Sequence, residues 1–311
     1  MKYQLAYQSL RGARPTNQDR VAHAERDNAV LMVLADGLGG YRGGEIAAEL
    51  LTQTVLRGFR AVKQPLIQQP SAFLALSIVQ AHNAINDLGR AHPELKPRTT
   101  CVLCLVQNGY AYWAHVGDSR LYHFRKGQLL RRTQDHTTTE EWRREGLLSD
   151  EEVRHHPQKS RLLKCVGGAD RPTISLGEET CLEYGDTLLL CSDGLWSAFT
   201  PEEMLEFLKR GPLEESVEDM LTAAERKQRA TSDNVSAVCL RWEEAVTKIA
   251  PLQGNRAGDV DPRELWEYGK RVSAAQKQRK PASNDDRSSR DLAQDIRDLE
   301  DYLNKKIGPK R

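Results

Sequence analysis

The sequence predicts an α+β fold in which antiparallel β-sheets pack face to face and helices cover their outer faces. Two observations support this prediction. Asn108-Gly109 separates two apolar runs by two residues, which is a strong signal for a β-hairpin, and Lys126-Gly127 marks a second turn. The helical segments come in successive pairs and do not alternate singly with strands, which disfavours parallel βαβ units.

Short apolar or β-branched runs, each bounded by Gly, Asn or Asp, are predicted to be strands. Several of them follow one another closely along the chain, so we expect neighbouring strands to pair as hairpins. The predicted strands cover residues 4–9, 30–35, 99–107, 110–116, 120–125, 187–191 and 235–242.

Two pairs of helices are predicted between these strands. Apolar residues recur at helical spacing over residues 45–62, and Pro70-Ser71 caps a second helix that runs to about residue 90. The second pair begins at Thr200-Pro201-Glu202-Glu203, a capping box with Pro at the first helical position. It continues with a helix over about residues 215–229, before the last strand.

The composition changes near residue 244, where strand-like sequence gives way to a segment rich in Lys, Arg, Asp, Gln and Ser. We therefore expect one domain over residues 1–244. A C-terminal extension over residues 245–311, made of a linker and short helices, is expected to follow.

A helix is predicted within this extension over residues 289–304. Its four large apolar residues recur at a spacing of 4, 3 and 4, as in a short coiled-coil stripe. One interpretation is that the stripe docks on a partner or on a second copy. The other is a solvated helix that lies on the domain or frays. The four residues are Leu292, Ile296, Leu299 and Leu303.

The charge balance and hydropathy exclude several classes of protein. Lys and Arg total 45 and Asp and Glu total 44, so the formal net charge is +1 and gives no reason to expect binding to nucleic acid or to an anionic membrane. The longest apolar stretch has seven residues, whereas a bilayer span needs roughly 20. The amino terminus lacks the apolar core of a signal peptide, so we expect a cytosolic, cytoplasmic protein.

Six cysteines are present, and in a cytosolic protein their thiols are expected to be reduced. Only Cys101 and Cys104 form a CxxC motif, with no second pair and no His pair at zinc-finger spacing. We therefore interpret them as small buried side chains on a strand and not as zinc ligands.

An apolar run that stops at an Asp beside Gly, Ser or Asn recurs along the chain. Three such runs end at Asp36, Asp118 and Asp193. In the fourth case the order is reversed, and the apolar run follows Asp233. Turn formation alone explains any single occurrence. Four such carboxylates brought together would repel one another, which favours a bound cation. Mg²⁺ or Mn²⁺ fits best, because these ions accept ligands that are all oxygen.

Arg14, in the segment RPTNQD, lies near Asp19 and outside any helical charge pattern. Its planar guanidinium suits a phosphate group, although a lone Arg is also commonly a solvated surface residue. The run DGLGGYRGGE is not a nucleotide loop, because Arg42 stands at the third Gly of GxGxxG and no Gly-Lys-Ser/Thr occurs. GxSxG is also absent, so a Ser-His-Asp hydrolase has no support.

These segments resemble the metal-dependent protein phosphatase family, called PPM or protein phosphatase 2C, and most closely its bacterial serine/threonine members. RPTNQD is similar to RxxNED, ADGLGGYRGGE to ADGMGGxxxGE, and RTTCVLCLV to the family's GTT strand. HVGDSRLYHFRKGQLLRRTQDHT is similar to VGDSRxYxxRxGxLxxLTxDHS, and CSDGLW and SDNVSAV match the remaining metal motifs. The motifs follow the family's order over residues 3–242.

The resemblance implies a four-layer α-β-β-α sandwich of two antiparallel sheets flanked by helix pairs. It also implies two Mn²⁺ or Mg²⁺ ions bridged by Asp36, with the Gly37 carbonyl, Asp193 and Asp233 as further ligands. Asp118 and Asp193 would hold a third, weaker ion.

The resemblance further implies that Arg14 binds the substrate phosphate and that Asp19 orders water and Arg14. The implied reaction is attack of a metal-bridging hydroxide on phosphoserine or phosphothreonine of a protein, without a phosphoenzyme. Phosphorylated proteins and a cognate bacterial-type kinase are the implied partners. Two alternatives are a phosphoprotein-binding regulatory module with little turnover and hydrolysis of a small phosphoester.

The sequence departs from the family pattern at three positions. Gln18 replaces Glu, and Arg98 replaces the Gly before Thr99-Thr100. Leu38 stands where animal members have a His proposed as general acid, so we expect water at the metal ions to protonate the leaving alkoxide.

The region over residues 136–168 corresponds to the family's mobile flap and contains a capping box from Ser149 to Glu152. His115 comes directly before VGDS, and His136 lies in QDHT. We interpret both as strand or turn residues and not as metal ligands.

Overall fold

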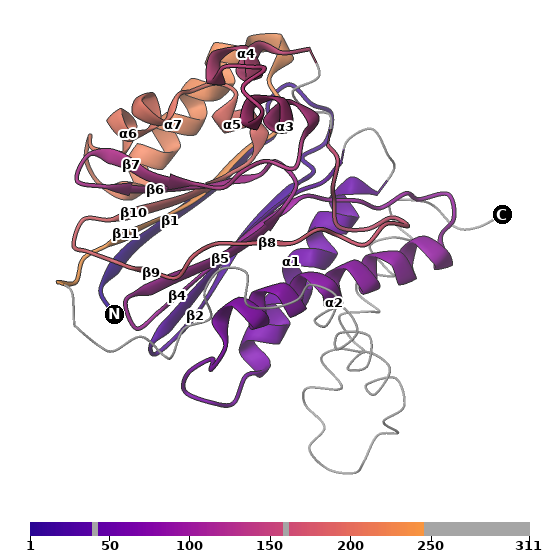
Figure 1. Cartoon of the computed structure of the whole chain (residues 1–311), viewed down its shortest axis with the longest axis horizontal. Coiled ribbons are helices and arrows are strands. Elements are labelled where there is room, and N and C mark those ends of the chain that lie inside the picture. The colour runs from indigo at the N-terminus through magenta and orange to yellow at the C-terminus, as the bar shows by residue number, and fades with distance from the viewer. Residues whose placement is uncertain (39–42, 158–161, 246–311) are drawn as a thin grey trace. The chain divides into compact units, whose positions relative to one another are not determined.

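The computed structural model describes residues 1–38, 43–157 and 162–245 (Figure 1). The chain divides into two compact units, Met1–Gly269 and Lys270–Arg311, and every described residue belongs to the first. The helix predicted over residues 289–304, like nearly all of the extension, lies outside the described residues, so that prediction remains open.

The described part of the chain contains two β-sheets in which all paired strands are antiparallel. The strands are β1 (Tyr3–Leu10), β2 (Asp19–Arg26), β3 (Ala29–Asp36), β4 (Cys101–Gln107), β5 (Tyr110–Val116), β6 (Arg120–Arg125), β7 (Gln128–Arg132), β8 (Ser175–Leu176), β9 (Thr180–Cys181), β10 (Thr187–Cys191) and β11 (Val235–Trp242). One sheet has the order β1-β11-β10-β6-β7. The other has the order β2-β3-β4-β5-β8, and β9 also pairs with β5.

All seven predicted strands are present, and the two predicted turns join β4 to β5 and β6 to β7. The sequence patterns did not predict β2, β7, β8 or β9. The sequence of β2, DRVAHAER, is largely polar and only partly buried, and β7 is an exposed edge strand. The short β8 and β9 have two residues each, too few for a periodic pattern.

The two predicted pairs of helices are present, one between β3 and β4 and the other between β10 and β11. The helices are α1 (Gly44–Ala61), α2 (Pro70–Ala91), α3 (Thr138–Arg144), α4 (Asp150–His155), α5 (Asp193–Trp196), α6 (Pro201–Leu208) and α7 (Leu213–Gln228), and a 3-10 turn covers Arg229–Thr231. Both predicted capping boxes are confirmed, one at Ser149 before α4 and one at Thr200 before α6. No helix in the described residues is both long enough and apolar enough to cross a membrane.

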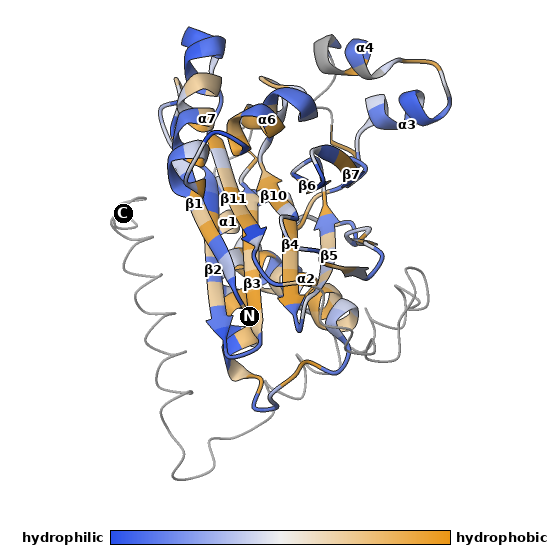
Figure 2. Cartoon of the chain, turned by 90° about the vertical axis from the view of Figure 1, so that its left-hand side faces the viewer, coloured by the Kyte–Doolittle hydropathy of each residue, from blue (hydrophilic) through white to orange (hydrophobic). Residues whose placement is uncertain are grey.

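The elements form four layers, as the sequence predicted. In Figure 1, α1 and α2 cover one sheet, α6 and α7 cover the other, and the two sheets face each other between them. Figure 2 shows that the central strands of both sheets are largely apolar.

The central strands are apolar on both faces because each face packs against another layer. In β11, Val235, Ala237 and Cys239 pack toward α5, α6 and α7. The alternate residues Val238 and Leu240 pack between the two sheets. Successive side chains of a strand point to opposite faces, so a strand buried on both faces has a continuous apolar sequence.

Cys101 and Cys104 are three residues apart on β4, and they therefore point to opposite faces of the sheet. Cys104 packs between the sheets, and both thiols are free and fully buried. Burial raises the pKa of Cys101 to about 12. The interpretation of these cysteines as small core residues is confirmed.

Candidate active site

One side of the site is formed by the ends of the neighbouring strands β2 and β3. Asp36 is the last residue of β3, after seven consecutive buried residues, and it pairs with Asp19, the first residue of β2. The next residue, Gly37, donates its N–H to the Gln18 carbonyl at 3.1 Å. A Cβ at Gly37 would lie 2.3 Å from the Gly44 carbonyl oxygen, so the backbone passes here only because residue 37 has no side chain.

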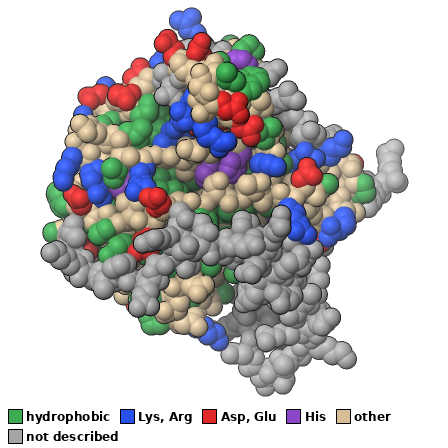
Figure 3. Space-filling view, in the orientation of Figure 1, with side chains coloured by type: hydrophobic (Ala, Val, Ile, Leu, Met, Phe, Trp, Pro, Cys, Tyr) green, Lys and Arg blue, Asp and Glu red, His purple; other side chains and the backbone are tan. Residues whose placement is uncertain are grey.

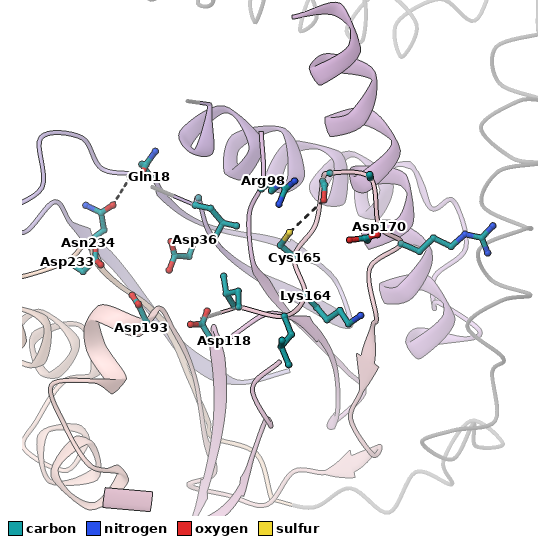
Figure 4. Close-up of a pocket in the computed structure, with 18 of the residues that line it drawn as sticks. Gln18, Asp36, Arg98, Asp118, Lys164, Cys165, Asp170, Asp193, Asp233 and Asn234 are labelled. Atoms are coloured by element: carbon teal, nitrogen blue, oxygen red, sulfur yellow. Dashed lines mark hydrogen bonds between the residues drawn. The ribbon is translucent and has the colours of Figure 1, made fainter. Parts of the chain in front are cut away.

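The other carboxylates come from three further strand ends. Asp193 begins α5 directly after β10, and Asp233 lies just before β11, the strand that pairs with β10. Asp118 follows β5 and Gly117, whose φ of +103° is a conformation that favours glycine. Figure 4 shows Asp36, Asp118 and Asp193 around one common space.

A cavity of about 460 Å³ opens between these strand ends. Its lining contains six of the seven predicted site residues, namely Arg14, Asp36, Gly37, Asp118, Asp193 and Asp233. The seventh, Asp19, is 2% exposed and lies outside this lining, behind Asp36. The structure therefore brings the predicted residues together in one place.

The carboxylates in the cavity destabilise one another's charged forms. Burial raises the pKa of Asp36 well above its ordinary value, and the negative charges of Asp19 and Asp193 raise it further. Burial and then the charge of Asp193 also raise the pKa of Asp118. A cation placed among these groups would reverse both effects.

The donor groups fit a hard divalent cation. They are all oxygens, and Asp19 has in addition a buried Oδ1 without a hydrogen-bond partner among the described residues. Although four carboxylates line one cavity, no group of three His, Cys, Asp or Glu side chains among the described residues is arranged to hold an ion by itself. Mg²⁺ and Mn²⁺ tolerate this, because they keep several water ligands and need few from the protein.

Asp19 is fixed by a hydroxyl from the opposite sheet. Ser192, between β10 and α5, donates its Oγ hydrogen bond to Asp19 Oδ2 at 2.8 Å. Burial raises the pKa of Asp19 to about 6. Sequence reasoning assigned no role to Ser192, although it stands directly before Asp193 in the motif CSDGLW.

Arg14 is held at the cavity by a residue 219 positions away. Its Nη2 lies 2.7 Å from Asp233 Oδ2, and about half of its side chain is exposed. The family resemblance implied that Asp19 orders Arg14, and that role stays a prediction; the hydrogen bond of Arg14 described here is with Asp233. The pKa of Arg14 is raised by this hydrogen bond with Asp233.

Asn234 positions the loop that carries Arg14, and sequence reasoning missed it. Its Nδ2 donates to the carbonyl oxygens of Arg11 at 2.7 Å and Thr16 at 3.1 Å, and its Oδ1 accepts from the Gln18 N–H at 2.9 Å. Its place directly after Asp233 in SDNVSAV was the available signal.

A buried ion pair lies behind Asp118, and it was also missed. Arg120 makes two hydrogen bonds with the Asp135 carboxylate, at 2.8 and 2.7 Å, and stacks 3.7 Å above the Trp196 ring. Trp196 in turn donates its Nε1–H to the Asp118 carbonyl at 2.9 Å. Arg120 is part of the motif GDSR and Asp135 is part of QDHT, but only the fold shows that these two residues form an ion pair.

The flap region is attached to the domain at its C-terminal end. Thr99 and Val166 exchange backbone hydrogen bonds of 3.0 and 2.8 Å, and the Gly167 N–H donates to His82 Nδ1 of α2 at 3.0 Å. Gly167 and Gly168 line the cavity. Residues 158–161 of this region lie outside the described residues.

His115 is buried and His136 is partly buried, and neither of them lines the cavity. Their rings stack at 4.8 Å, His115 Nε2 lies 2.7 Å from the Gln134 carbonyl, and His136 Nδ1 accepts from the Gly117 N–H at 3.2 Å. These contacts support the interpretation of both as structural residues.

The three departures from the family pattern all face the cavity. Gln18 donates from Nε2 to Glu45 Oε2 at 3.2 Å. Leu38 contributes only an apolar side chain, and Arg98 lies against Gly168.

Comparison with known proteins gives a consistent picture. A family model described as protein phosphatase 2C matches residues 9–238. The protein phosphatase PhpP of Streptococcus pneumoniae is 29% identical over 234 residues, covering 75% of this chain and 95% of that protein. The serine/threonine protein phosphatase PstP of Mycobacterium tuberculosis is 32% identical over 240 residues, covering 75% of this chain and 44% of that protein.

Solved structures agree with these matches. The serine/threonine phosphatase Stp1 from Staphylococcus aureus is 28% identical with a TM-score of 0.73, covering 78% of this chain and 96% of that chain. The catalytic domain of PstP, determined in complex with two manganese ions, is 28% identical with a TM-score of 0.67, covering 78% and 99%.

Proposed function

Because this chain belongs to the protein phosphatase 2C family, we propose that the cavity at the strand ends is the active site of a protein serine/threonine phosphatase. The observation that carries the proposal is the convergence of four carboxylates from four strand ends on one cavity. The relatives PstP and Stp1 are named as serine/threonine phosphatases, and PhpP is named as a protein phosphatase. The substrates are then phosphoserine and phosphothreonine residues of proteins.

In this proposal, Asp36, the Gly37 carbonyl, Asp193 and Asp233 hold two Mn²⁺ or Mg²⁺ ions. Asp118 and Asp193 hold a third ion more weakly. When bound, such ions supply Lewis acidity, which activates water for attack on phosphorus and neutralises charge on the phosphoryl oxygens. The two manganese ions of the PstP catalytic domain support this assignment.

The other side chains bind and orient the substrate. Arg14 is exposed at the cavity, and its guanidinium can form two parallel hydrogen bonds with phosphoryl oxygens. Asp19 keeps its buried position through Ser192 and supports Asp36 from the neighbouring strand. Leu38 has no proton to give, so the leaving alkoxide takes its proton from water.

The physiological setting follows from the substrate class. A phosphatase of phosphoserine and phosphothreonine acts on the products of a serine/threonine kinase, so we infer that a cognate kinase of bacterial type phosphorylates its substrates. We also infer that both act in the cytoplasm. A phosphoprotein-binding module with little turnover is the alternative, and the retention of all four carboxylates and Arg14 in one cavity argues against it.

The test is phosphate release from a phosphothreonine peptide with Mn²⁺, with Mg²⁺ and with EDTA, for the wild type and for Asp193→Asn. We expect metal-dependent turnover that falls at least about 100-fold in the variant, because losing a direct ligand costs more than losing an outer partner. Asp27→Asn is the matched control. Asp27 is exposed in the turn between β2 and β3, at the opposite end of the strands from Asp19 and Asp36.

Turnover that is unchanged in Asp193→Asn would refute the assignment of the site. A folded wild type without turnover in either metal would favour the binding module.

A further inference from the structure

The active-site cavity adjoins a second cavity of about 360 Å³. The two cavities share Arg98, Gly168 and Ala169 in their linings. The second cavity lies between the C-terminal end of α2 and the chain that leads into β4. Figure 4 shows Arg98 on the flap side of the active site, beside Cys165 and away from Asp193 and Asp233.

The second cavity has a strongly basic lining. Arg90, Lys96 and Arg98 line it, and none of the described residues in its lining is Asp or Glu. Arg90 forms an ion pair with Asp87 on α2, which leaves an excess of positive charge in the cavity. Figure 3 shows several basic side chains gathered at the right of the view, over the part of the molecule where Figure 1 shows α2.

Basic side chains also line the flap side of the active-site cavity. Lys164 and Arg171 lie there, together with the acidic Asp170. The carboxylates that form the candidate metal site lie at the other end of the same cavity. The charge of the lining residues therefore changes from acidic at the strand ends to basic in the second cavity.

The fold holds Arg98 in its place between the cavities. The Arg98 carbonyl accepts the Leu38 N–H at 3.0 Å, and the next residue, Thr99, pairs with Val166 of the flap. The side chain lies against Gly168, where a Cβ would lie 3.0 Å from Arg98 Nε and 3.2 Å from its Cζ. Gly168 has a φ of +84°, so both its conformation and its lack of a side chain leave room for the guanidinium.

We propose that this second cavity, bounded by Arg90, Lys96 and Arg98, is a subsite for an acidic group that flanks the phosphorylated residue of the substrate. This inference rests on the proposed phosphatase function and names the class of phosphoprotein that the same site prefers. Arg98 has a planar guanidinium, the type of group that pairs with a carboxylate or with a second phosphoryl group, and Lys96 adds a positive charge.

The occupant is a neighbouring part of the same peptide. An extended peptide advances about 3.3 Å per residue, so adjoining cavities are occupied by side chains within a few positions of each other. The subsite therefore binds an acidic group that lies a few residues from the phosphoserine or phosphothreonine. It selects acidic or multiply phosphorylated segments over neutral and basic ones.

The test compares phosphothreonine peptides that differ only in their flanking residues. Glu, Gln or Lys is placed on the N-terminal side of the phosphothreonine in one set and on the C-terminal side in the other. A further peptide has a second phosphothreonine in place of Glu. The measured quantity is kcat/KM for each peptide with the wild type, Arg98→Gln, Lys96→Glu and Arg60→Gln. Turnover of p-nitrophenyl phosphate, which has no flanking residues, is measured in parallel.

We expect the wild type to prefer the Glu peptide to the Gln peptide by about fivefold, which is about 1 kcal/mol. Arg98→Gln should lower this ratio toward one, and Lys96→Glu should lower it or reverse it in favour of Lys. Lys96 is exposed, so its replacement does not disturb the core if Arg98→Gln fails to fold. Arg60→Gln should keep the wild-type ratio, because Arg60 is exposed at the opposite end of α1 from the cavity.

The result that overturns the subsite is a wild-type ratio near one for Glu, Gln and Lys peptides, or a preference that both variants retain. A greater kcat/KM for the doubly phosphorylated peptide than for the Glu peptide identifies a phosphoryl occupant, and the reverse order identifies a carboxylate. No turnover of any substrate, including p-nitrophenyl phosphate, would instead refute the phosphatase function on which the proposal rests.

Discussion

Buried charge dominates the energetics of individual residues around the site. Arg120 and Asp135 are 4% and 6% exposed, and each is the main partner of the other. The stacking of Arg120 on Trp196 connects this pair to the backbone of Asp118. Removing one partner would leave the other charge buried and uncompensated, which is much more costly than losing an exposed ion pair.

Arg120→Ala should therefore lower the free energy of unfolding by about 3–5 kcal/mol. Arg131→Ala is the control, since Arg131 forms an exposed ion pair with Glu178 and its loss should cost less than about 1 kcal/mol. Urea unfolding followed by circular dichroism measures both. Equal losses in the two variants would contradict the role given to the buried pair.

His82 is a second buried residue whose charge state affects stability. It is 2% exposed, and burial lowers its pKa from 6.5 to about 4. Its Nδ1 accepts from the Gly167 N–H, so the neutral ring has its proton on Nε2, which lies 2.8 Å from the Asn86 amide nitrogen. Since both nitrogens have partners, we assign the Asn86 amide oxygen to the position facing Nε2.

The sign of the pH effect follows from the lowered pKa. Above pH 6.5 the ring is neutral in both states, and His82 adds no pH dependence. Between pH 6.5 and 4 the unfolded state takes up the proton first, so the folded state loses up to about 3 kcal/mol as the pH falls.

His82→Asn keeps an acceptor for Gly167 and removes the titration. The stability advantage of the wild type over this variant should shrink as the pH falls from 7 to 4, measured as the difference in urea unfolding free energy. The nearby carboxylates titrate in both proteins and cancel in the difference. A difference that stays constant over this range would refute the buried neutral His82.

Among the elements, the helices depend on their end residues. In α6, the Thr200 Oγ1 accepts the Glu203 N–H at 3.2 Å, and Glu203 Oε2 accepts the Thr200 N–H at 2.7 Å. These two bonds satisfy backbone donors that the first turn of a helix leaves without partners.

Thr200→Ala should lower the free energy of unfolding by about 1 kcal/mol, and Thr200→Ser should retain most of the stability because its hydroxyl can still accept. Thermal unfolding of the two variants and the wild type measures the difference. If Ser and Ala behaved alike, the cap would not be the source of the effect.

The site lies at the ends of the strands because a carboxylate is less buried there than in the middle of a strand. In the central strands β3, β4, β10 and β11 nearly every position is buried, and a carboxylate there would be desolvated without a partner. At the ends of β3, β5 and β10, and at the start of β11, the chain leaves the core, so Asp36, Asp118, Asp193 and Asp233 reach the cavity. The arrangement keeps the charges at the edge of a rigid scaffold.

For the whole molecule, all described elements and every proposed ligand lie before residue 246. We expect a chain truncated after residue 245 to fold and to release phosphate from a phosphothreonine peptide at a rate within about twofold of the full chain. Circular dichroism and the same phosphate assay test this. Loss of folding on truncation would contradict the domain boundary predicted near residue 244.

The extension has a separate prediction. If the apolar stripe of residues 289–304 docks on a partner or on a second copy, deletion of residues 285–311 should abolish that binding or lower the mass in solution. Light scattering and affinity measurements test it. Unchanged binding and mass would refute docking.

Local sequence patterns predicted most of the fold and the composition of the site. Apolar runs that end at Asp predicted the strand ends, Thr200 and Ser149 predicted helix starts, and Asn108-Gly109 predicted a turn. These features depend on backbone torsion and burial over a few residues, so they can be recognised in a short window of sequence.

Partnerships between distant residues were decided only by the tertiary structure. The pairing of Arg14 with Asp233, of Arg120 with Asp135 and of Gly167 with His82 depends on strand order and on the place of the flap. The same holds for the contact of Arg98 with Gly168 that separates the two cavities. The physical reason is that the sequence at one position gives the type of a side chain. Its neighbours, in contrast, are set by the packing of layers whose residues are far apart in the sequence.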